Sequence, residues 1–356
     1  MTPQVARAPA GGAGAGDISP GNDRRPALSV IIKALNEAAK IEACLRSVLA
    51  ATDAATTEII VADSLSDDET VAVAARFPVK VVQLVQTVDR GCGSAAQLGF
   101  QYARGRRLLL LDGDMELDPD FLPAAHAALD ADAKLAGVGG LVVDRVMTLE
   151  FRRRNQKQPK NGAPGEHDHL NGGGLFRTEA IQPFGFFTDR NLHAFEELDL
   201  GLRLAAAGWH MRRLDRPSVY HYGHSTAAFP LLLQRWRTRY LHGQGELLRA
   251  LWRTKYRWRG IRGARLSFAV MLWWLLLLAL LLSALFSPIP GISAMAFAVV
   301  LIGPALLQCL RKRDLAMGLY SIALVNFHAA GLLAGLLAPR IDPKQRIDSV
   351  VRHPGA

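Results

Sequence analysis

Apolar runs and amphipathic segments alternate between residues 27 and 144 of the chain. The apolar runs are short and rich in Val, Ile and Leu, a pattern typical of strands that are buried in a sheet. They lie at Ala27–Leu35, Thr57–Ser64, Val79–Val85, Arg106–Asp114 and Ala136–Asp144. The segments between them have helical spacing, and Asn36 is expected to cap the first. They lie at Asn36–Ala51, Ser66–Phe77, Gly93–Ala103 and Asp118–Ala131. The alternation predicts an α/β fold in which parallel strands are covered by helices.

The pattern changes in the second half of the chain. Phe151–Gly174 is polar, basic and rich in glycine, so we expect a loop that is mobile until a ligand binds. Ala194–Trp209 has the pattern of an amphipathic helix with acidic residues in its first turn. Phe229–Gly260 mixes Leu, Trp and Tyr with Arg, a composition typical of a helix that lies in the membrane interface.

Three long apolar segments follow. Leu266–Phe286 carries no charge over 21 residues, which is enough for a helix to cross about 30 Å of hydrocarbon. Gly291–Leu310 is also uncharged, and the basic residues that flank the pair place both flanks in the cytoplasm, so the two segments form a hairpin. Leu315–Leu337 either crosses again or lies partly in the interface. Three crossings are favoured, although the basic tail after Pro339 argues against its translocation across the membrane.

These patterns divide the chain into five parts. Residues 1–26 are rich in Gly, Ala and Pro and lack the apolar core of a signal peptide, so we expect a disordered tail. Next come an α/β domain, a basic amphipathic interfacial segment, a transmembrane region of about three helices and a C-terminal tail. Their predicted bounds are 27–228, 229–265, 266–338 and 339–356. The α/β domain is expected in the cytoplasm.

The positive charge is concentrated beside the apolar segments. The formal net charge is +10, and Arg235–Arg265 contains nine Arg and one Lys against a single acid, Glu246. A basic cluster suits nucleic acid or an anionic membrane surface, and its place before an apolar run favours the membrane. The cluster contains no groove-reading motif, so a nucleic-acid partner is not expected. The three cysteines lack disulfide or metal spacing, which indicates a reducing compartment.

Polar residues stand at the ends of three predicted strands. Asn36 and Glu37 follow the first strand, Asp63 ends the second, and Asp112 and Asp114 end the fourth. In open α/β sheets, ligands bind beyond the carboxyl ends of the strands. The sequence therefore predicts a binding site at this edge of the sheet.

The Asp112-Gly-Asp114 pair is the strongest candidate for chemistry. Mg²⁺ and Mn²⁺ prefer oxygen ligands and keep positions open for phosphate oxygens. Such a metal stabilises the charge that develops on a diphosphate leaving group. In isolation, Asp-Gly-Asp is more often a turn. Its place after four leucines, in line with Glu37 and Asp63, favours the metal site.

A transfer from such a diphosphate to a hydroxyl would also need a base. Glu196, Glu197 and Asp199 are candidates, although acids at a helix start also simply favour the helix dipole. Gly172, Gly173 and Gly174 would let the backbone approach a phosphate or sugar closely. The histidines at 167, 169, 193, 221 and 224 lack the spacing of a zinc site, so structural zinc is not expected.

The ordered set of motifs from about Ala27 to Gly245 resembles an inverting family-2 glycosyltransferase of the GT-A fold. That fold is a Rossmann-like mixed sheet with helices on both faces, here followed by interfacial helices and C-terminal transmembrane helices. The resemblance implies nucleotide contacts, metal ligands and a base. The nucleotide contacts would be Asn36, Glu37, Asp63 and Asp112, the metal ligands Asp114 and Asp112, and the base Glu197 or its neighbour Glu196.

The resemblance extends to the segments around these motifs. It implies that Gly172, Gly173 and Gly174 lie near the donor sugar and acceptor, and that Arg235 and Trp236 belong to a segment that closes over the diphosphate. The chain departs from the family pattern in several places. Lys33 stands where many relatives have Pro, Leu65 where Gly is usual, and Glu197 where Asp is commoner. The Gln234-Arg235-Trp236 triplet lacks the full QxxRW spacing of processive synthases.

The apolar segments resemble those of bacterial enzymes that assemble exopolysaccharide repeat units, such as the succinoglycan type. The resemblance implies transfer from a nucleotide-diphosphate sugar, UDP favoured, to a lipid-linked acceptor, with Mg²⁺ or Mn²⁺ as cofactor. It also implies a multi-pass protein of the inner membrane that contacts the anionic cytoplasmic leaflet. The alternatives are a processive polysaccharide synthase, a nucleotidyltransferase on a similar fold, and a membrane protein that binds sugar nucleotides without turnover.

Overall fold

One mixed sheet of ten strands organises the part of the chain that the structure describes. The structure is a computed structural model, and it describes residues 25–145, 163–170, 172–223, 226–286 and 290–355. The strands are β1 Leu28–Ala34, β2 Thr57–Asp63, β3 Lys80–Leu84, β4 Arg107–Asp112, β5 Met115–Leu117, β6 Leu135–Asp144, β7 Gly165–His167, β8 Gly174–Arg177, β9 His210–His221 and β10 Ser349–Pro354. Their order is β10-β3-β2-β1-β4-β8-β6-β9-β5, and β7 pairs with β9.

The first four predicted strands pair in parallel, as expected. β1 lies between β2 and β4, and β3 lies beyond β2. The fifth predicted strand, β6, does not follow β4 directly, because β8 lies between them and is antiparallel to both. β9 is parallel to β6, and β5 is antiparallel to β9. The predicted mixed α/β sheet is therefore confirmed.

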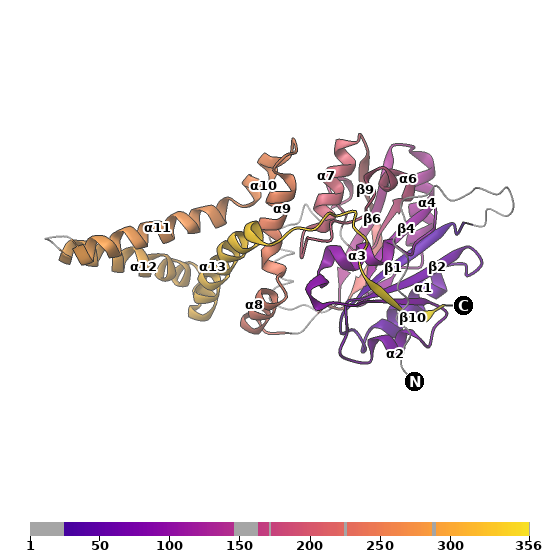
Figure 1. Cartoon of the computed structure of the whole chain (residues 1–356), viewed down its shortest axis with the longest axis horizontal. Helices are drawn as coiled ribbons and strands as arrows, with labels where there is room; N and C mark the ends of the chain where they lie inside the picture. Colours follow the sequence, from indigo (N-terminus) through magenta and orange to yellow (C-terminus); the bar gives the residue numbers. More distant parts are fainter. Residues whose placement is uncertain (1–24, 146–162, 171, 224–225, 287–289, 356) are drawn as a thin grey trace.

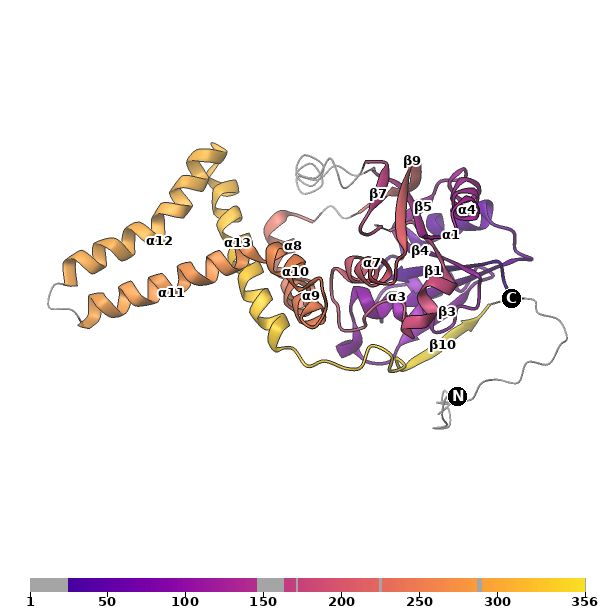
Figure 2. The ribbon, with the colours of Figure 1, turned by 90° about the horizontal axis from the view of Figure 1, so that it is seen from above.

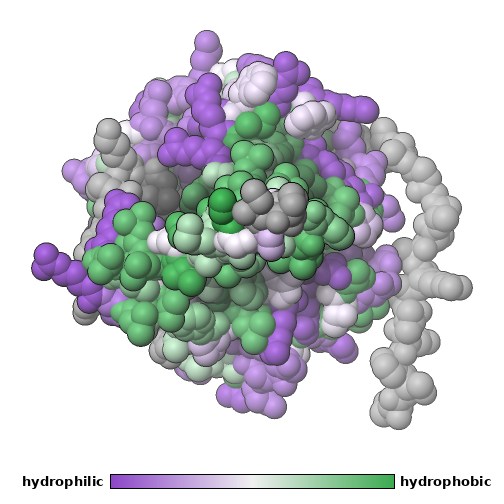
Figure 3. Space-filling view, turned by 90° about the vertical axis from the view of Figure 1, so that its left-hand side faces the viewer, coloured by the Kyte–Doolittle hydropathy of each residue, from purple (hydrophilic) through white to green (hydrophobic). Residues whose placement is uncertain are grey.

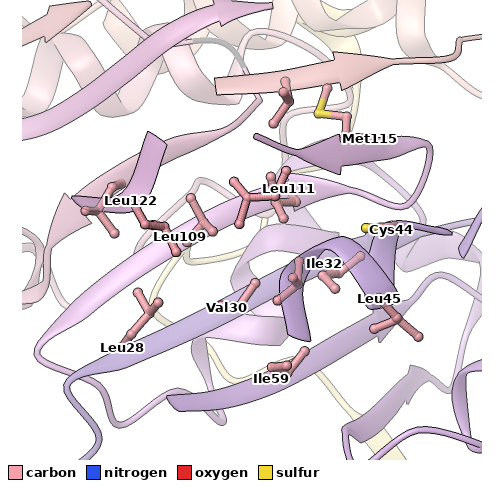
Figure 4. Packing of buried hydrophobic residues seen from close by; sticks show 14 of the residues in the cluster. Leu28, Val30, Ile32, Cys44, Leu45, Ile59, Leu109, Leu111, Met115 and Leu122 are labelled. Carbon is pink, nitrogen blue, oxygen red and sulfur yellow. The ribbon is translucent and has the colours of Figure 1, made fainter. Parts of the chain in front are cut away.

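Helices cover both faces of this sheet (Figure 1). The helices of the α/β part are α1 Ile41–Ala51, α2 Thr70–Ala74, α3 Cys92–Phe100, α4 Phe121–Ala131, α6 Thr178–Ile181 and α7 Glu196–Ala206, with 3₁₀ turns η1 Thr87–Asp89 and η2 Gln182–Phe184. Successive residues of β1 point to opposite faces. Val30 and Ile32 pack into one core with α1 and α4, whereas Ile31 packs into a second core with α3 and α7. Figure 4 shows Cys44 and Leu45 of α1 beside Ile32 of β1 in the first core.

The first helix starts later than the sequence predicts. Asn36 was expected to cap it, but α1 begins at Ile41 and has no side-chain cap. Asn36 instead has a left-handed backbone with a φ of 58°, and its side-chain oxygen accepts a hydrogen bond from the backbone N–H of Asp67 at 3.0 Å. Asn and Asp side chains often stabilise loops in this way. Here Asn36 holds the loops after β1 and β2 together.

The second half of the chain contributes the predicted interfacial and apolar helices. They are α8 Ala228–Arg237, η3 Tyr240–His242, α9 Gly243–Leu251, α10 Arg257–Gly263, α11 Arg265–Phe286, α12 Pro290–Lys312 and α13 Leu315–Leu337. The last three are long and apolar enough to cross a membrane. α11 and α12 extend away from the α/β part as a hairpin (Figure 2). Figure 3 faces the outer end of this hairpin and shows apolar residues over it, with polar residues around them.

The residues after Pro339, expected to be a tail, return to the sheet. β10 pairs antiparallel with β3 and so forms an edge of the sheet. Ile347 is fully buried with Ile60, Val82 and Leu98. Its backbone N–H donates to Gln101 Oε1 at 2.7 Å, and its carbonyl accepts from Gln101 Nε2 at 3.1 Å. The C-terminal residues are therefore part of the folded α/β domain.

The first prediction tests how much this returning strand contributes to stability. Ile347→Ala should lower the unfolding free energy by about 2–5 kcal/mol, because it leaves a cavity in a closed core. Val350→Ala is the matched control, since Val350 is 41% exposed and should change stability by less than about 0.5 kcal/mol. Denaturant unfolding of the detergent-solubilised protein measures both. Equal effects of the two variants would contradict the packed strand.

Candidate active site

A cleft of about 700 Å³ opens at the carboxyl ends of the parallel strands. Clefts of this volume are typical of small-molecule sites. Three of the predicted residues line it, namely Glu37, Asp112 and Asp114. The remaining walls come from the end of β9, the start of α3 and the α8–η3 segment. These walls contain His221, Arg90, Gly91, Cys92, Gln234, Arg237, Thr238, Arg239 and Tyr240. The predicted convergence of strand ends is thus present as one cavity.

Lys33 joins two of the predicted acids. Its Nζ lies 2.9 Å from Asp112 Oδ1 and 3.3 Å from Glu196 Oε1, and its side chain is only 11% exposed. Burial alone lowers the pKa of Lys33, but the two carboxylates outweigh it and raise that pKa well above its usual value. The lysine therefore stays charged and holds β1, β4 and α7 together at the cleft.

A second charge cluster surrounds Asp114. Its Oδ2 lies 3.3 Å from His221 Nε2 and 3.8 Å from Lys40 Nζ. His221 Nδ1 in turn lies 2.8 Å from Asp144 Oδ1, and Lys40 Nζ lies 3.4 Å from Glu37 Oε2. Burial and the nearby Asp114 raise the pKa of Glu37 to about 7. Burial also acts to raise the pKa of Asp114, but the hydrogen bond and charge of His221 outweigh it and lower that pKa.

The donor set around Asp114 fits a divalent cation that also binds phosphate. Carboxylate oxygen and imidazole nitrogen are both ligands for Mn²⁺-type ions, and Asp144 orients His221 as outer partners of metal-binding histidines do. In the described part of the chain, no three His, Cys, Asp or Glu side chains form a complete cage. A phosphate-bridging ion is held by one or two carboxylates and by the phosphate oxygens themselves, so the lack of a cage among the described residues is compatible with an ion at Asp114.

Asp63 lies beside the cleft and is held from several sides. It is fully buried, accepts hydrogen bonds from the backbone N–H of Ser66 at 3.0 Å and from Gln83 Nε2 at 2.7 Å, and also binds the Ser66 hydroxyl. Gln83 Oε1 accepts from Arg352 Nε of β10 at 2.7 Å. Because a guanidinium can only donate, Arg352 orients the amide of Gln83 with its nitrogen toward Asp63. The returning C-terminal strand thus contributes to this subsite.

The family models match this region. Residues 29–187 match Glycosyl transferase family 2, and residues 172–309 match Glycosyl transferase family group 2. The chain contains a glycosyltransferase family 2 domain. Together the two matches run from β1 to residue 309 in α12.

Curated relatives match part of this glycosyltransferase. It is 34% identical over 125 residues to the succinoglycan biosynthesis protein ExoO of Rhizobium meliloti, a match that covers 35% of this chain and 36% of the relative. It is 32% identical over 114 residues to a dolichol-phosphate mannosyltransferase of Mycosarcoma maydis, covering 30% of this chain and 39% of the relative. The chain thus spans less than two fifths of the length of either relative.

A solved structure resembles the fold over most of both chains. A mannosyltransferase from Pyrobaculum calidifontis, solved in complex with GDP-Man and Mn²⁺, has a TM-score of 0.54 at 21% sequence identity. The similarity covers 88% of this chain and 88% of that chain. The predicted GT-A fold of this glycosyltransferase is therefore confirmed.

Strained backbone borders the cleft of the glycosyltransferase. Asn36, Leu65 and Arg239 have positive φ values of 58°, 61° and 60°, a region that costs non-glycine residues energy. The left-handed φ of Leu65 gives a physical reason for the glycine that is usual there. Arg90 Nε donates to the Ser64 carbonyl at 2.9 Å and also binds the Leu65 carbonyl. Strain of this kind persists where surrounding contacts fix it, and it clusters at active sites.

The predicted acids of α7 lie behind Lys33 and are not among the described residues that line the cleft. Glu196 contacts Lys33, and Asp199 pairs with Arg203 at 2.8 Å within the helix. Burial raises the pKa of Glu197 well above its usual value, and the charge of Glu196 raises it further. α7 begins directly after Phe195, whose φ of 68° is left-handed. The three acids therefore differ in their partners: Glu196 pairs with Lys33 and Asp199 with Arg203. Burial raises the pKa of both Glu197 and Asp199.

The glycine segment approaches the same carboxylates. A Cβ on Gly172 would meet the Met115 side chain and lie 3.4 Å from Asp112 Oδ2. Gly173 has a φ of 86°, and its N–H donates to the Leu110 carbonyl at 2.8 Å. Gly174 begins β8 and is buried. Asn171 and the section of the expected mobile loop at 151–162 lie outside the described residues.

The basic segment reaches the cleft with residues next to the predicted ones. Arg235 stacks over the Tyr240 ring at 5.1 Å, and Trp236 packs edge-on against Phe327 of α13 at 5.6 Å. Neither is among the described lining residues, whereas Arg237 and Arg239 are. The segment that the motif marks thus borders the cleft, with Arg237 at the end of α8 and Arg239 just before η3 as its arginines among the described lining residues.

The second prediction concerns the buried lysine. Lys33→Met should lower the unfolding free energy by about 3–5 kcal/mol, because it leaves Asp112 and Glu196 close together without their shared cation. Because the pKa of Lys33 is raised in the folded protein, its contribution is fully present below about pH 10, the unfolded pKa of lysine, and is lost only as the pH rises through the higher folded pKa. Denaturant unfolding at about pH 6 and pH 9 should therefore give the same deficit. A Lys40→Met control, at a more exposed lysine, should lose much less.

Proposed function

We propose that the protein transfers a sugar from a nucleotide-diphosphate sugar, with UDP favoured, to a lipid-linked acceptor. The transfer serves the synthesis of a cell-surface polysaccharide or glycolipid. It takes place at the cytoplasmic face of the inner membrane. The observation that carries the proposal is the cleft of a family 2 domain in which Glu37, Asp112, Asp114 and His221 meet beside the buried Asp63.

The strand-end residues would bind the donor. Asp63 is buried and preoriented by Gln83 and Ser66, which suits recognition of the base of the nucleotide. Asn36, Glu37 and Asp112 would complete the nucleotide contacts. Gly172, Gly173 and Gly174 would let the backbone approach the sugar, because Gly172 has no side chain between Met115 and Asp112.

Asp114 and His221 would hold Mg²⁺ or Mn²⁺, with Asp112 as a further oxygen ligand. When bound, the ion would neutralise the charge on the diphosphate leaving group. Arg237 and Arg239, together with Arg235 of the same segment, would add positive charge beside that leaving group. The neighbour from Pyrobaculum calidifontis was solved with GDP-Man and Mn²⁺, which supports including both in any test.

Glu197 would be the base that accepts the proton of the acceptor hydroxyl. Its raised pKa makes it a better proton acceptor than an ordinary carboxylate near neutral pH. Glu196 pairs with Lys33, and its negative charge would keep the pKa of Glu197 high. A single base with no second nucleophile leads to direct displacement, so the anomeric configuration of the sugar would invert.

The acceptor side of the proposal follows from the helices beside the cleft. The α8–η3 segment contributes both to the cleft wall and to the apolar helical part through Phe327 and Tyr320. An acceptor anchored in lipid would therefore meet the cleft from the membrane side. The relatives include a succinoglycan biosynthesis protein and dolichol-phosphate mannosyltransferases, which supports an acceptor on a lipid carrier.

The third prediction is the donor screen that tests this function. Purified protein in membrane lipid should release nucleoside diphosphate from one of several UDP-sugars or GDP-mannose, and only with Mg²⁺ or Mn²⁺ present. Addition of lipid-carrier acceptors should raise that release and give a product with one added sugar. Asp114→Ala should abolish transfer while leaving the unfolding midpoint close to that of the wild type.

Each alternative predicts a different product. Pyrophosphate would indicate a nucleotidyltransferase, and a product of many sugars would indicate a processive synthase. Donor binding without turnover for every acceptor would indicate a non-catalytic protein. Substantial metal-dependent activity in Asp114→Ala would contradict the metal site.

The fourth prediction separates the two neighbouring acids. Glu197→Gln should lower kcat by about 10²–10⁴-fold, the usual contribution of a general base, with little change in donor affinity.

Because the base must be ionised, the wild-type rate should rise with pH through the raised pKa of Glu197. Glu196→Gln removes a negative charge that raises the pKa of Glu197. The acidic limb of the pH–rate profile of this variant should therefore move to lower pH. Steady-state rates between about pH 5 and pH 9 measure this. If Glu196→Gln loses turnover as Glu197→Gln is expected to, the base is Glu196.

A further inference from the structure

We propose that only α11 and α12 cross the membrane, and that α13 lies in the interface of the leaflet that faces the catalytic domain. The partner of the exposed face of α13 is then the headgroup and upper acyl region of that leaflet. This inference rests on the membrane attachment in the proposed function and replaces the three crossings that the sequence favours.

Both ends of the apolar region are attached to the same folded domain. At its start, Ser267 Oγ donates to Gln244 Oε1 of α9 at 2.7 Å. At its end, Arg340 lies 2.7 Å from Asp189 Oδ2, and β10 pairs with β3 of the catalytic sheet. One folded domain lies on one side of a membrane. A chain that leaves this domain and returns to it therefore crosses an even number of times.

The attachment of the returning chain is extensive. Asn191 exchanges two hydrogen bonds of 2.8 Å with the backbone of Ile341, and Arg190 donates to the carbonyls of Gln345 and Arg346 at 3.1 and 3.2 Å. Asp189, which pairs with Arg340, is only 2% exposed. Loss of Arg340 would leave the buried charge of Asp189 without this cation, which is destabilising. The segment that follows α13 is thus held against the catalytic domain as part of its fold.

α13 also packs differently from the hairpin. Of its most apolar stretch, 28% is buried, against 6% for α11 and 0% for α12. A Cβ on Gly331 or Gly335 would collide with the carbonyl oxygens of Leu241 and His242, so these glycines let α13 lie directly on η3 and α9. Arg249 of α9 donates to the Leu336 carbonyl at 3.2 Å. A charged arginine at the end of α13 places that end outside the hydrocarbon.

The direction of α13 agrees with an interfacial position. α11 and α12 run together away from the domain, whereas α13 runs across the base of this hairpin in both views (Figures 1 and 2). A hairpin inserted along the membrane normal leaves α13 along the membrane plane. Residues 311–313 before α13 are basic, and Arg340 follows it. Cations at both ends favour the same anionic leaflet for both.

The exposed face of α13 is apolar. Leu315, Leu319, Leu333 and Leu337 are between 40% and 84% exposed, as expected for side chains that dip into lipid. On its other face, Tyr320 contacts Phe229 of α8 at 5.2 Å between ring centroids. Since the α8–η3 segment continues into the cleft wall, α13 would hold that wall at the lipid surface.

The fifth prediction tests the crossing number by labelling single added cysteines in membranes. A membrane-impermeant maleimide is applied to spheroplasts and to inverted vesicles, and labelling of the wild-type protein gives the background. Ile292→Cys, at the outer end of the hairpin and 65% exposed, should be labelled at least about tenfold more in spheroplasts. Val350→Cys should show the reverse, as should the matched control Lys312→Cys at the inner end of α12.

The two topologies differ at one position. Three crossings would expose Val350→Cys in spheroplasts together with Ile292→Cys, and this result would overturn the proposal. Labelling of Ile292→Cys only in inverted vesicles would also overturn it, because no hairpin would then cross. A disulfide between Val82→Cys and Val351→Cys, which are paired in register, formed when membranes are treated with an added thiol oxidant, would support the return. None of these measurements uses donor or acceptor, so they stand apart from the test of sugar transfer.

Discussion

A buried lysine at the end of the first strand holds the site together. Lys33 is the cation shared by Asp112 of β4 and Glu196 of α7. Two carboxylates brought close together away from water repel each other, so the charge between them stabilises the approach of α7 to β4. Because α7 is anchored through Glu196, the next residue, Glu197, is also fixed relative to the cleft. The spacing between the donor subsite and the base of the proposed reaction thus depends on one ammonium group.

The strand-end residues of the site could be predicted because parallel strands bring their carboxyl ends to one edge. Glu37, Asp112 and Asp114 follow their strands directly in the sequence, and all three line the cleft. His221 could not be found in this way. It reaches Asp114 only because β9 pairs antiparallel with β5, which sets His221 opposite Met115. Nothing in the sequence near His221 marks that pairing.

The same limit applies to the termini of elements and to the end of the chain. The basic segment was predicted to close over the diphosphate through Arg235 and Trp236. Among the described lining residues its arginines are instead Arg237, at the end of α8, and Arg239, whose left-handed backbone follows that helix, while Trp236 packs toward α13. The final residues read as a basic tail because they are few and polar. Their pairing with β3 depends on an edge strand nearly 270 residues earlier, as the contact between Gln83 and Arg352 illustrates. Long-range pairing of this kind leaves no local periodicity.

This returning strand couples the membrane region to the nucleotide subsite. The chain leaves α13, is held at Asp189 through Arg340, buries Ile347 in the core and ends beside Gln83. There Arg352 can only donate, so Gln83 must present its amide nitrogen to Asp63. Without that guanidinium the amide could turn over and direct its oxygen at a buried carboxylate, which is repulsive. The orientation of Asp63, which is proposed to recognise the base of the nucleotide, therefore depends on the position of β10. That strand is placed by the same contacts that return the chain from the membrane to the catalytic domain.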